Sequence, residues 1–434
     1  MAAFELRDPI HKRIVFDEVE RSVIDHPFFQ RLRFISQLGF IQAYVYPGGV
    51  HDRFAHGIGA MHVAGRLFGR FVASSDILTS RFSHIEINAL RRRVRLAGLL
   101  HDIGHGPFSH ASESVFPSII GLPLDWSWWK ERPNRQARHE DYSVLMIQAL
   151  AERGVLARDV AQDIASLVHD QVVPSPSFAQ FESRAPTLQK ILKSIISGEV
   201  DCDRMDYLLR DSYFCGVAYG QYDLDWLVSC IGLSECNGRL IMTISENGVR
   251  AFEDVLLARY HMIDQVYFHK TKAGFTHYLE AAIESGEIPL VIPKDPETYA
   301  QMRDGKVIEM MFEAAKDPKN YWSHHLINRL PARRILRLHD DKPEDAATLQ
   351  TLRRLCEDNG IRYFAHSAKN ALSQFGELSD ANAIIHVAKK TLAGTEFVPI
   401  GRYSDLLQKY DEKLRFTDFF VLREEADTFA ALAK

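Results

Sequence analysis

The segment from Leu99 to His110, LLHDIGHGPFSH, constrains this chain more than any other stretch of its 434 residues. An apolar, helix-like run ends in the adjacent pair His101 and Asp102, and two more histidines follow on a turn that contains Gly and Pro. An imidazole beside a carboxylate offers a divalent metal one nitrogen and one oxygen ligand from neighbouring backbone positions. Because ionisable groups so near an apolar segment are costly to bury without a partner, the segment predicts a metal or catalytic site.

Hydrophobic periodicity predicts a mainly α fold, because apolar residues recur at intervals of three and four over most of the first 330 residues. After about residue 330, short apolar runs between helix-like segments predict a small mixed α/β C-terminal region. The expected domains are a helical core over 1–330 and this small region over 331–434. Two loop insertions are expected in the core, near 119–138 with three tryptophans at the surface, and near 171–186 with three prolines.

The expected helix over 88–101 places His101 on its inward face, together with its apolar residues. It also carries four arginines, which are predicted to form a solvated face: Arg91, Arg92, Arg93 and Arg95.

Charge and cysteine usage exclude several classes of partner. The formal net charge of −5 gives no general field for nucleic acid or an anionic membrane, so nucleic-acid binding is not favoured and no membrane association is expected. The five cysteines form no CxxC pair and the first residues show no signal-peptide pattern, which predicts a reduced cytoplasmic setting. No apolar run reaches transmembrane length.

A divalent metal site needs about four to six ligands, three or four of them from the protein. His101 and Asp102 supply two. His56 begins an expected helix and Asp203 lies in the run DCDRMDY, but no spacing rule connects either residue to the pair. Each has a plain alternative, His56 as a helix-start residue and Asp203 as an N-cap or ion-pair partner.

Five sequence blocks in a fixed order carry a resemblance to a known family. They are DPIH from Asp8, FQRLRFI from Phe29, RFAH from Arg53, the segment from Leu99 to His110, and the run from Asp203. This order resembles the HD-domain phosphohydrolases. It is similar in particular to their dNTP triphosphohydrolases, both the vertebrate type that joins a sterile-alpha motif to an HD domain and the bacterial dGTPase-like type. The resemblance implies a helical HD-domain core that binds one divalent metal, which could be Mn, Mg, Fe, Zn or Ni.

The resemblance also assigns roles to individual residues. The implied metal ligands are His56, His101, Asp102 and Asp203. The implied catalytic residues are His105, His110 and His139, with Glu113 as the acidic residue that orients a histidine. The implied substrate-binding residues are Arg53, Arg204 and Lys270 for the triphosphate, Gln37, Tyr207 and Asp211 for the deoxyribose, and Tyr267 near the base.

A regulatory site is a further implication of the resemblance. Asp25, Gln30 and Arg33 match positions that bind an activating guanine nucleotide at a subunit interface. A plain helix with charged faces, in which Asp25 caps the turn before Pro27, explains the same residues equally well. If the site exists, the protein would be a nucleotide-assembled homo-oligomer, a dimer or a tetramer, with GTP or a dNTP as activator.

The expected function is metal-dependent hydrolysis of dNTPs to a deoxynucleoside and inorganic triphosphate. Two alternatives stay open from the sequence. One is another HD-domain phosphohydrolase, acting on nucleoside monophosphates, cyclic nucleotides, alarmones or single-stranded nucleic acid. The other is a nucleotide sensor whose metal site is vestigial.

Overall fold

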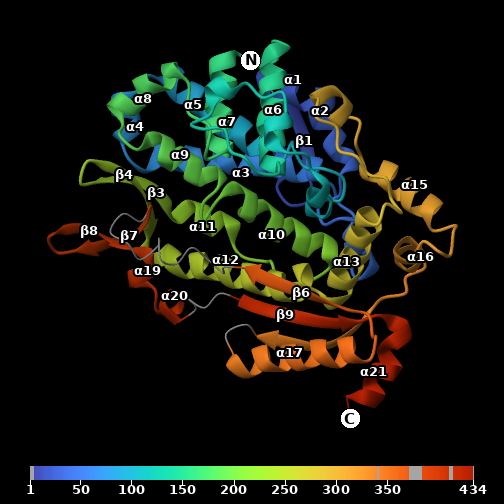
Figure 1. Ribbon diagram of the computed structural model, residues 1–434. Helices are drawn as coiled ribbons and strands as arrows, with labels where there is room; N and C mark the ends of the chain where they lie inside the picture. Colours follow the sequence, from blue (N-terminus) through green and yellow to red (C-terminus); the bar gives the residue numbers. More distant parts are fainter. Residues whose placement is uncertain (1–3, 340–341, 371–383, 410–413, 434) are drawn as a thin grey trace.

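The computed structural model describes residues 4–339, 342–370, 384–409 and 414–433. It confirms a mainly α fold with small sheets (Figure 1). The longer helices are α3 (Arg53–Ser74), α5 (His84–Leu100), α6 (His139–Glu152), α7 (Arg158–Val168), α9 (Leu188–Ile196), α10 (Cys202–Cys215), α12 (Val249–Met262), α13 (Lys270–Glu284), α15 (Asp304–Ala314) and α17 (Pro343–Asp358). Within the described ranges, no helix is both long and apolar enough to cross a membrane.

Side-chain caps fix where the ligand-bearing helices begin. Asp52 accepts a hydrogen bond from the backbone of Ala55 at 2.8 Å and starts α3, and Asp201 accepts one from Arg204 at 2.7 Å and starts α10. Such caps satisfy backbone donors that have no partner within the helix. His56 and Asp203 therefore both lie in the first turn of a capped helix.

Small residues let α3 and α5 approach closely. A Cβ added at Gly98 of α5 would lie 3.1 Å from the carbonyl oxygen of Ala60, and one at Gly57 of α3 would lie 3.1 Å from that of Leu99. The two backbones are thus nearly in contact where the helices pack against each other. This close packing brings His56 of one helix opposite His101 at the end of the other.

The described residues form three sheets beside the helices. The strands are β1 (Phe4–Asp8), β2 (Lys12–Phe16), β3 (Ile231–Cys236), β4 (Arg239–Ser245), β5 (Arg333–His339), β6 (Tyr363–Asn370), β7 (Ile385–Thr391), β8 (Gly394–Pro399) and β9 (Leu414–Val421). One sheet has the order β3-β4-β7-β8 and another the order β5-β9-β6. The parallel pairing of β4 with β7 joins the two expected domains in one sheet, so the boundary at 330 stays a prediction.

Several expectations about exposure were wrong. Arg93 and Arg95 are buried, because Arg93 Nε donates to Asp163 at 2.7 Å and Arg95 Nε donates to Glu20 at 2.5 Å. Trp128 and Trp129 belong to the core instead of the surface. The segment 119–138 contains only two 3₁₀ turns, as expected of a loop, whereas 171–186 includes the short helix α8 (Ala179–Arg184).

The turn after Asp102 packs tightly against the start of α6, and Gly104 makes this possible. A Cβ at this position would lie 2.1 Å from the carbonyl oxygen of His139 and 2.2 Å from the backbone nitrogen of Ser143. We expect Gly104→Ala to lower the free energy of unfolding by about 1–3 kcal/mol through overpacking. Thermal and denaturant unfolding measure this loss.

Gly69, exposed on α3, provides the matched control. Nothing lies within 4 Å of a Cβ added there, so Gly69→Ala should leave stability unchanged or raise it by up to about 1 kcal/mol. Equal unfolding midpoints for the two variants would contradict the close packing of the turn.

Candidate metal centre and active-site cavity

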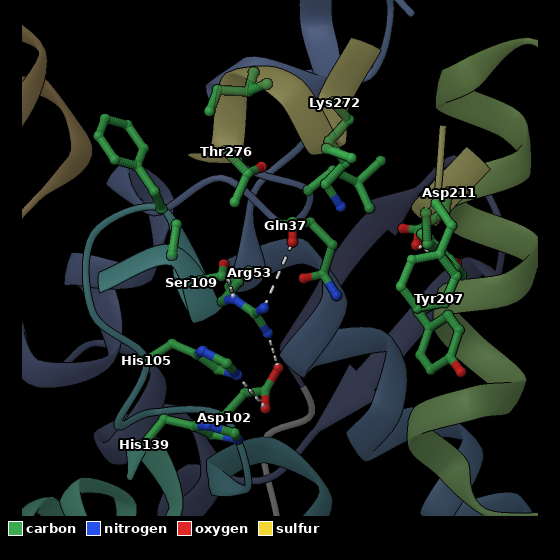
Figure 2. A pocket seen from close by; sticks show the side chains of 18 of the residues that line it. Gln37, Arg53, Asp102, His105, Ser109, His139, Tyr207, Asp211, Lys272 and Thr276 are labelled. Atoms are coloured by element: carbon green, nitrogen blue, oxygen red, sulfur yellow. Dashed lines mark hydrogen bonds and ion pairs between the residues drawn. The ribbon is translucent and has the colours of Figure 1, made fainter. Parts of the chain in front are cut away.

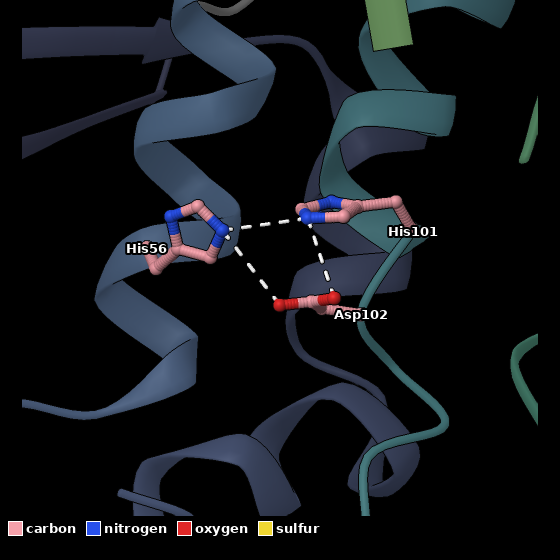
Figure 3. Close-up of side chains that lie close together, drawn as sticks. All are labelled: His56, His101 and Asp102. Carbon is pink, nitrogen blue, oxygen red and sulfur yellow. Dashed lines mark hydrogen bonds and ion pairs between the residues drawn. The ribbon is translucent and has the colours of Figure 1, made fainter. Parts of the chain in front are cut away.

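The four predicted metal ligands converge from three helices, and Figure 3 shows three of them. His56 Nε2 lies 3.3 Å from His101 Nε2, 3.0 Å from Asp203 Oδ1 and 3.7 Å from Asp102 Oδ2. Metal–ligand bonds of about 2.1 Å place neighbouring donor atoms about 3.0–3.4 Å apart. His56, His101 and Asp102 therefore lie close enough together to hold one divalent ion, and Asp203 adjoins the two imidazoles.

Both imidazoles are oriented by a contact at their other ring nitrogen. His56 Nδ1 lies 2.8 Å from Asp206 Oδ2, and His101 Nδ1 lies 2.9 Å from the carbonyl oxygen of Gly98. An acceptor at Nδ1 places the ring proton there and leaves the Nε2 lone pair for a metal. This tautomer is the one that a metal between these residues requires.

Asp206 was not anticipated from the sequence, although it lies three residues after Asp203 on the same helix. Its carboxylate also contacts His11 Nε2 at 2.7 Å and accepts two hydrogen bonds from Arg210, each at 2.8 Å. Burial opposes the charge, but Arg210 and the two histidines hold the pKa of Asp206 well below its usual range. The ion pair fits only because Gly59 faces it, since a Cβ there would overlap the carboxylate.

A second cluster of polar side chains adjoins the metal ligands. Arg53 donates to Asp102 and, at 2.9 Å, to the hydroxyl of Ser109. His105 Nε2 lies 3.2 Å from Asp102 Oδ1, and the ring of His105 stacks on that of His139 at 3.8 Å between centroids. The predicted neighbours of the reacting phosphate, Arg53, His105 and His139, thus lie together.

Glu113 reaches His139, and its Oε1 lies 2.6 Å from His139 Nδ1. Burial opposes protonation of His139, but this hydrogen bond raises its pKa. Burial, Arg53 and His139 instead lower the pKa of His105 well below its usual value. The side chain of His110 lies outside the described residues, so its role stays a prediction.

A cavity of about 610 Å³ opens beside these groups (Figure 2). Asp102, Asp203 and His139 line it at the metal end. The four residues predicted to contact sugar and base also line it: Gln37, Tyr207, Asp211 and Tyr267. The Tyr267 hydroxyl donates to Asp211 Oδ2 at 2.7 Å, and His51 Nε2 lies 2.8 Å from Asp211 Oδ1.

Two predicted triphosphate contacts lie elsewhere. Lys270 is exposed at the first residue of α13, and Arg204 donates to the carbonyl oxygen of Gly198 and lies 3.4 Å from Glu199. Neither is among the residues that line the cavity. Lys272, two residues further along α13, lines it instead.

The cavity also contains residues that the sequence did not single out. The polar ones are Lys272, Thr276 and Glu280 of α13 and His366 of β6. The first three are spaced by four residues, which is a helical periodicity visible in the sequence. His366 carries no comparable signal, because its strand belongs to the C-terminal region.

A second cavity, of about 500 Å³, reaches the same centre from another side. It shares Asp102, His139 and Asp203 with the first cavity. Arg135, one of its lining residues, is held by Asp141 at 2.6 Å. Two of the predicted metal ligands, Asp102 and Asp203, therefore line both cavities.

The residues of the predicted regulatory site lie together at the surface, away from both cavities. Gln30 Nε2 donates to the carbonyl oxygen of Ile24 at 2.8 Å, and Arg33 Nε donates to Gln30 Oε1 at 2.9 Å. Asp25 is exposed and pairs with Arg21 at 3.1 Å. This arrangement is compatible with a nucleotide site and with a plain helix end, so the site stays a prediction.

Asp206 generates a testable prediction about metal affinity. Asp206→Asn keeps the shape of the side chain but removes the charge that orients His56, so metal affinity should fall about 10- to 100-fold. Equilibrium dialysis with Mn(II) measures this. The control is Asp225→Asn, which removes an exposed partner of Arg66. Unchanged affinity in Asp206→Asn would contradict the orienting role.

Comparison with known proteins adds independent findings. Residues 53–211 match the HD domain, and residues 223–347 match the HD associated region. An uncharacterized protein from Methanocaldococcus jannaschii is 34% identical over 266 residues, which cover 61% of this chain and 46% of that protein. This chain thus spans about half the length of that relative.

Two further matches extend over nearly the whole chain. The deoxynucleoside triphosphate triphosphohydrolase SAMHD1 homolog of Dictyostelium discoideum is 25% identical over 420 residues, 95% of this chain and 72% of that protein. The crystal structure of a hypothetical protein from Aquifex aeolicus superimposes with a TM-score of 0.73 at 23% identity and covers both chains completely. The HD-domain match includes all four residues predicted to hold a metal, so this chain carries an HD domain followed by an HD associated region.

Proposed function

We propose that this protein hydrolyses deoxynucleoside triphosphates to a deoxynucleoside and inorganic triphosphate in a metal-dependent reaction. One observation carries the proposal: a single cavity of about 610 Å³ has metal-ligand carboxylates at one end and the sugar-type contacts Tyr207 and Asp211 further along. This volume suits a ligand of nucleotide size. The relative from Dictyostelium, named as a dNTP triphosphohydrolase, supports the same substrate class.

The sugar side of the cavity has groups suited to a deoxyribose. Asp211 is fixed by His51 and Tyr267, and its carboxylate can accept a hydrogen bond from a 3′-hydroxyl. The side-chain oxygen of Gln37 is buried without a hydrogen-bond partner among the described residues, which favours a ligand donor there. The ring of Tyr207 would pack against C2′ and exclude a 2′-hydroxyl by its bulk.

The reacting phosphate would lie between Arg53, His105 and His139. When bound, a divalent metal polarises a phosphoryl oxygen and acidifies water. Arg53 supplies positive charge beside Asp102, and His105 stays neutral and can donate one hydrogen bond. His139 holds a proton at Nδ1 toward Glu113, which suits it to exchange a proton at Nε2 with water or the leaving ribose oxygen.

The proposal extends to regulation and assembly. Asp25, Gln30 and Arg33 would bind an activating GTP or dNTP, because the exposed carboxylate of Asp25 and guanidinium of Arg33 offer an acceptor and donors that match those of guanine. Activation would then accompany formation of a homo-oligomer, and size-exclusion chromatography with and without GTP tests this.

The direct test is hydrolysis of the four dNTPs and four rNTPs with Mn(II) or Mg(II), with and without GTP, followed by detection of inorganic triphosphate. We expect triphosphate release from dNTPs and its loss in His101→Ala, because that variant lacks one metal ligand. Absence of turnover with every triphosphate, or release of orthophosphate or pyrophosphate instead, would overturn the proposal.

Discrimination against ribose gives a prediction specific to one side chain. Tyr207→Ala removes the ring that would exclude a 2′-hydroxyl, so the ratio of rNTP to dNTP hydrolysis, in kcat/KM, should rise about tenfold or more. Tyr213→Ala is the matched control, since Tyr213 lies on the same helix but is 57% exposed. An unchanged ratio in Tyr207→Ala would show that another group rejects ribose.

A further inference from the structure

Helix α13 lines the cavity with a stripe of polar side chains. Lys272, Thr276 and Glu280 are spaced by four residues and so share one face of this helix. Lys272 and Thr276 lie on the side of the cavity opposite Asp102 and His139 (Figure 2). The stripe is therefore separated from the place where a phosphate would react.

Lys272 is an ammonium group that no side chain of the described residues neutralises. It makes no hydrogen bond or ion pair there, although it lines the cavity. Burial lowers its pKa to about 8, against the opposing effect of the Asp211 carboxylate. Because a half-buried cation without a partner has lost part of its hydration, a ligand acceptor that meets Lys272 stabilises the complex.

The neighbours of Lys272 indicate which part of a nucleotide would reach it. Asp211, the proposed contact of the sugar, lies close enough to affect the ammonium electrostatically. Lys272 in turn affects His366, which lines the cavity from β6. Lys272 thus lies beyond the sugar-binding residues as seen from the metal, where a substrate presents its base.

We propose that Lys272 reads the base, and that it selects guanine by donating hydrogen bonds to O6 and N7. Guanine presents these two acceptors side by side, and lysine is a preferred partner for the pair. Adenine carries an amino group in place of O6, and two donors facing each other are unfavourable. This inference rests on the proposed function and deepens it, because it names dGTP as the preferred substrate.

Thr276 and Glu280 complete the polar face. Glu280 makes no hydrogen bond or ion pair among the described residues, and burial raises its pKa. An amine and a carboxylate on one helix face complement a base that has both acceptors and donors on its edges, as guanine has. Thymine offers a single carbonyl on its corresponding edge and lacks N7, so it gains less from Lys272.

The test compares kcat/KM for dGTP, dATP and dITP in the wild type and in Lys272→Met, which keeps the side-chain length without the charge. The wild type should prefer dGTP and dITP, since both carry O6 and N7. Lys272→Met should lower kcat/KM for these two by about tenfold or more and change dATP by less than about threefold. Lys319→Met, on an exposed lysine far along the sequence, should change none of them.

A loss that is equal for all substrates, no loss for dGTP, or dITP behaving like dATP would overturn the assignment. Binding of 2′-deoxyguanosine and 2′-deoxyadenosine, measured by calorimetry, separates this inference from the proposed hydrolysis. A preference for deoxyguanosine that Lys272→Met abolishes supports base reading even if no triphosphate is cleaved. Equal binding of the two nucleosides, or binding of neither, overturns it.

Discussion

The buried carboxylate of Asp206 connects the metal ligands to three separate parts of the chain. It orients His56 on α3, accepts from Arg210 one turn later on α10, and contacts His11 beyond the first strand. Arg210 also donates to Asp8, which itself accepts from the backbone of the turn after β1. One negative charge inside the protein is thus surrounded by donors from distant segments, so loss of any donor would leave it partly unsatisfied.

The Asp206 network positions the residues at the metal end of the cavity. The residues at the other end come from later parts of the chain. The metal-side groups belong to the HD domain, whereas α13 belongs to the HD associated region and β6 to the C-terminal region. The two ends of the cavity are therefore built by different segments of the chain. The end formed by the later segments includes the amine of Lys272 and the imidazole of His366.

Predictions from the sequence failed where a partner lies far away along the chain. From the sequence, Arg93 and Arg95 look solvated because nothing local pairs with them. In the structure they pair with Asp163 and Glu20, which are distant in the sequence. The side chain of each arginine has an apolar stem, so one carboxylate partner for its guanidinium is enough to allow its burial. Glu113 was expected to orient a histidine, and the fold places it against His139, because η3 (Ser109–Val115) lies next to the start of α6.

The sequence by itself determined the helical character of the core, because its apolar residues recur with helical periodicity. It also singled out the adjacent pair His101 and Asp102, whereas His56 and Asp203 followed only from the resemblance. Only the tertiary structure decided which side chains face the cavity. Lys270 and Lys272 are two residues apart, so their side chains point about 200° apart around the helix axis. Sequence matching favoured Lys270, but the packing of α13 turns that residue to the solvent and Lys272 to the cavity. Orientation of a helix about its axis depends on all its neighbours, which is why the local sequence could not decide between them.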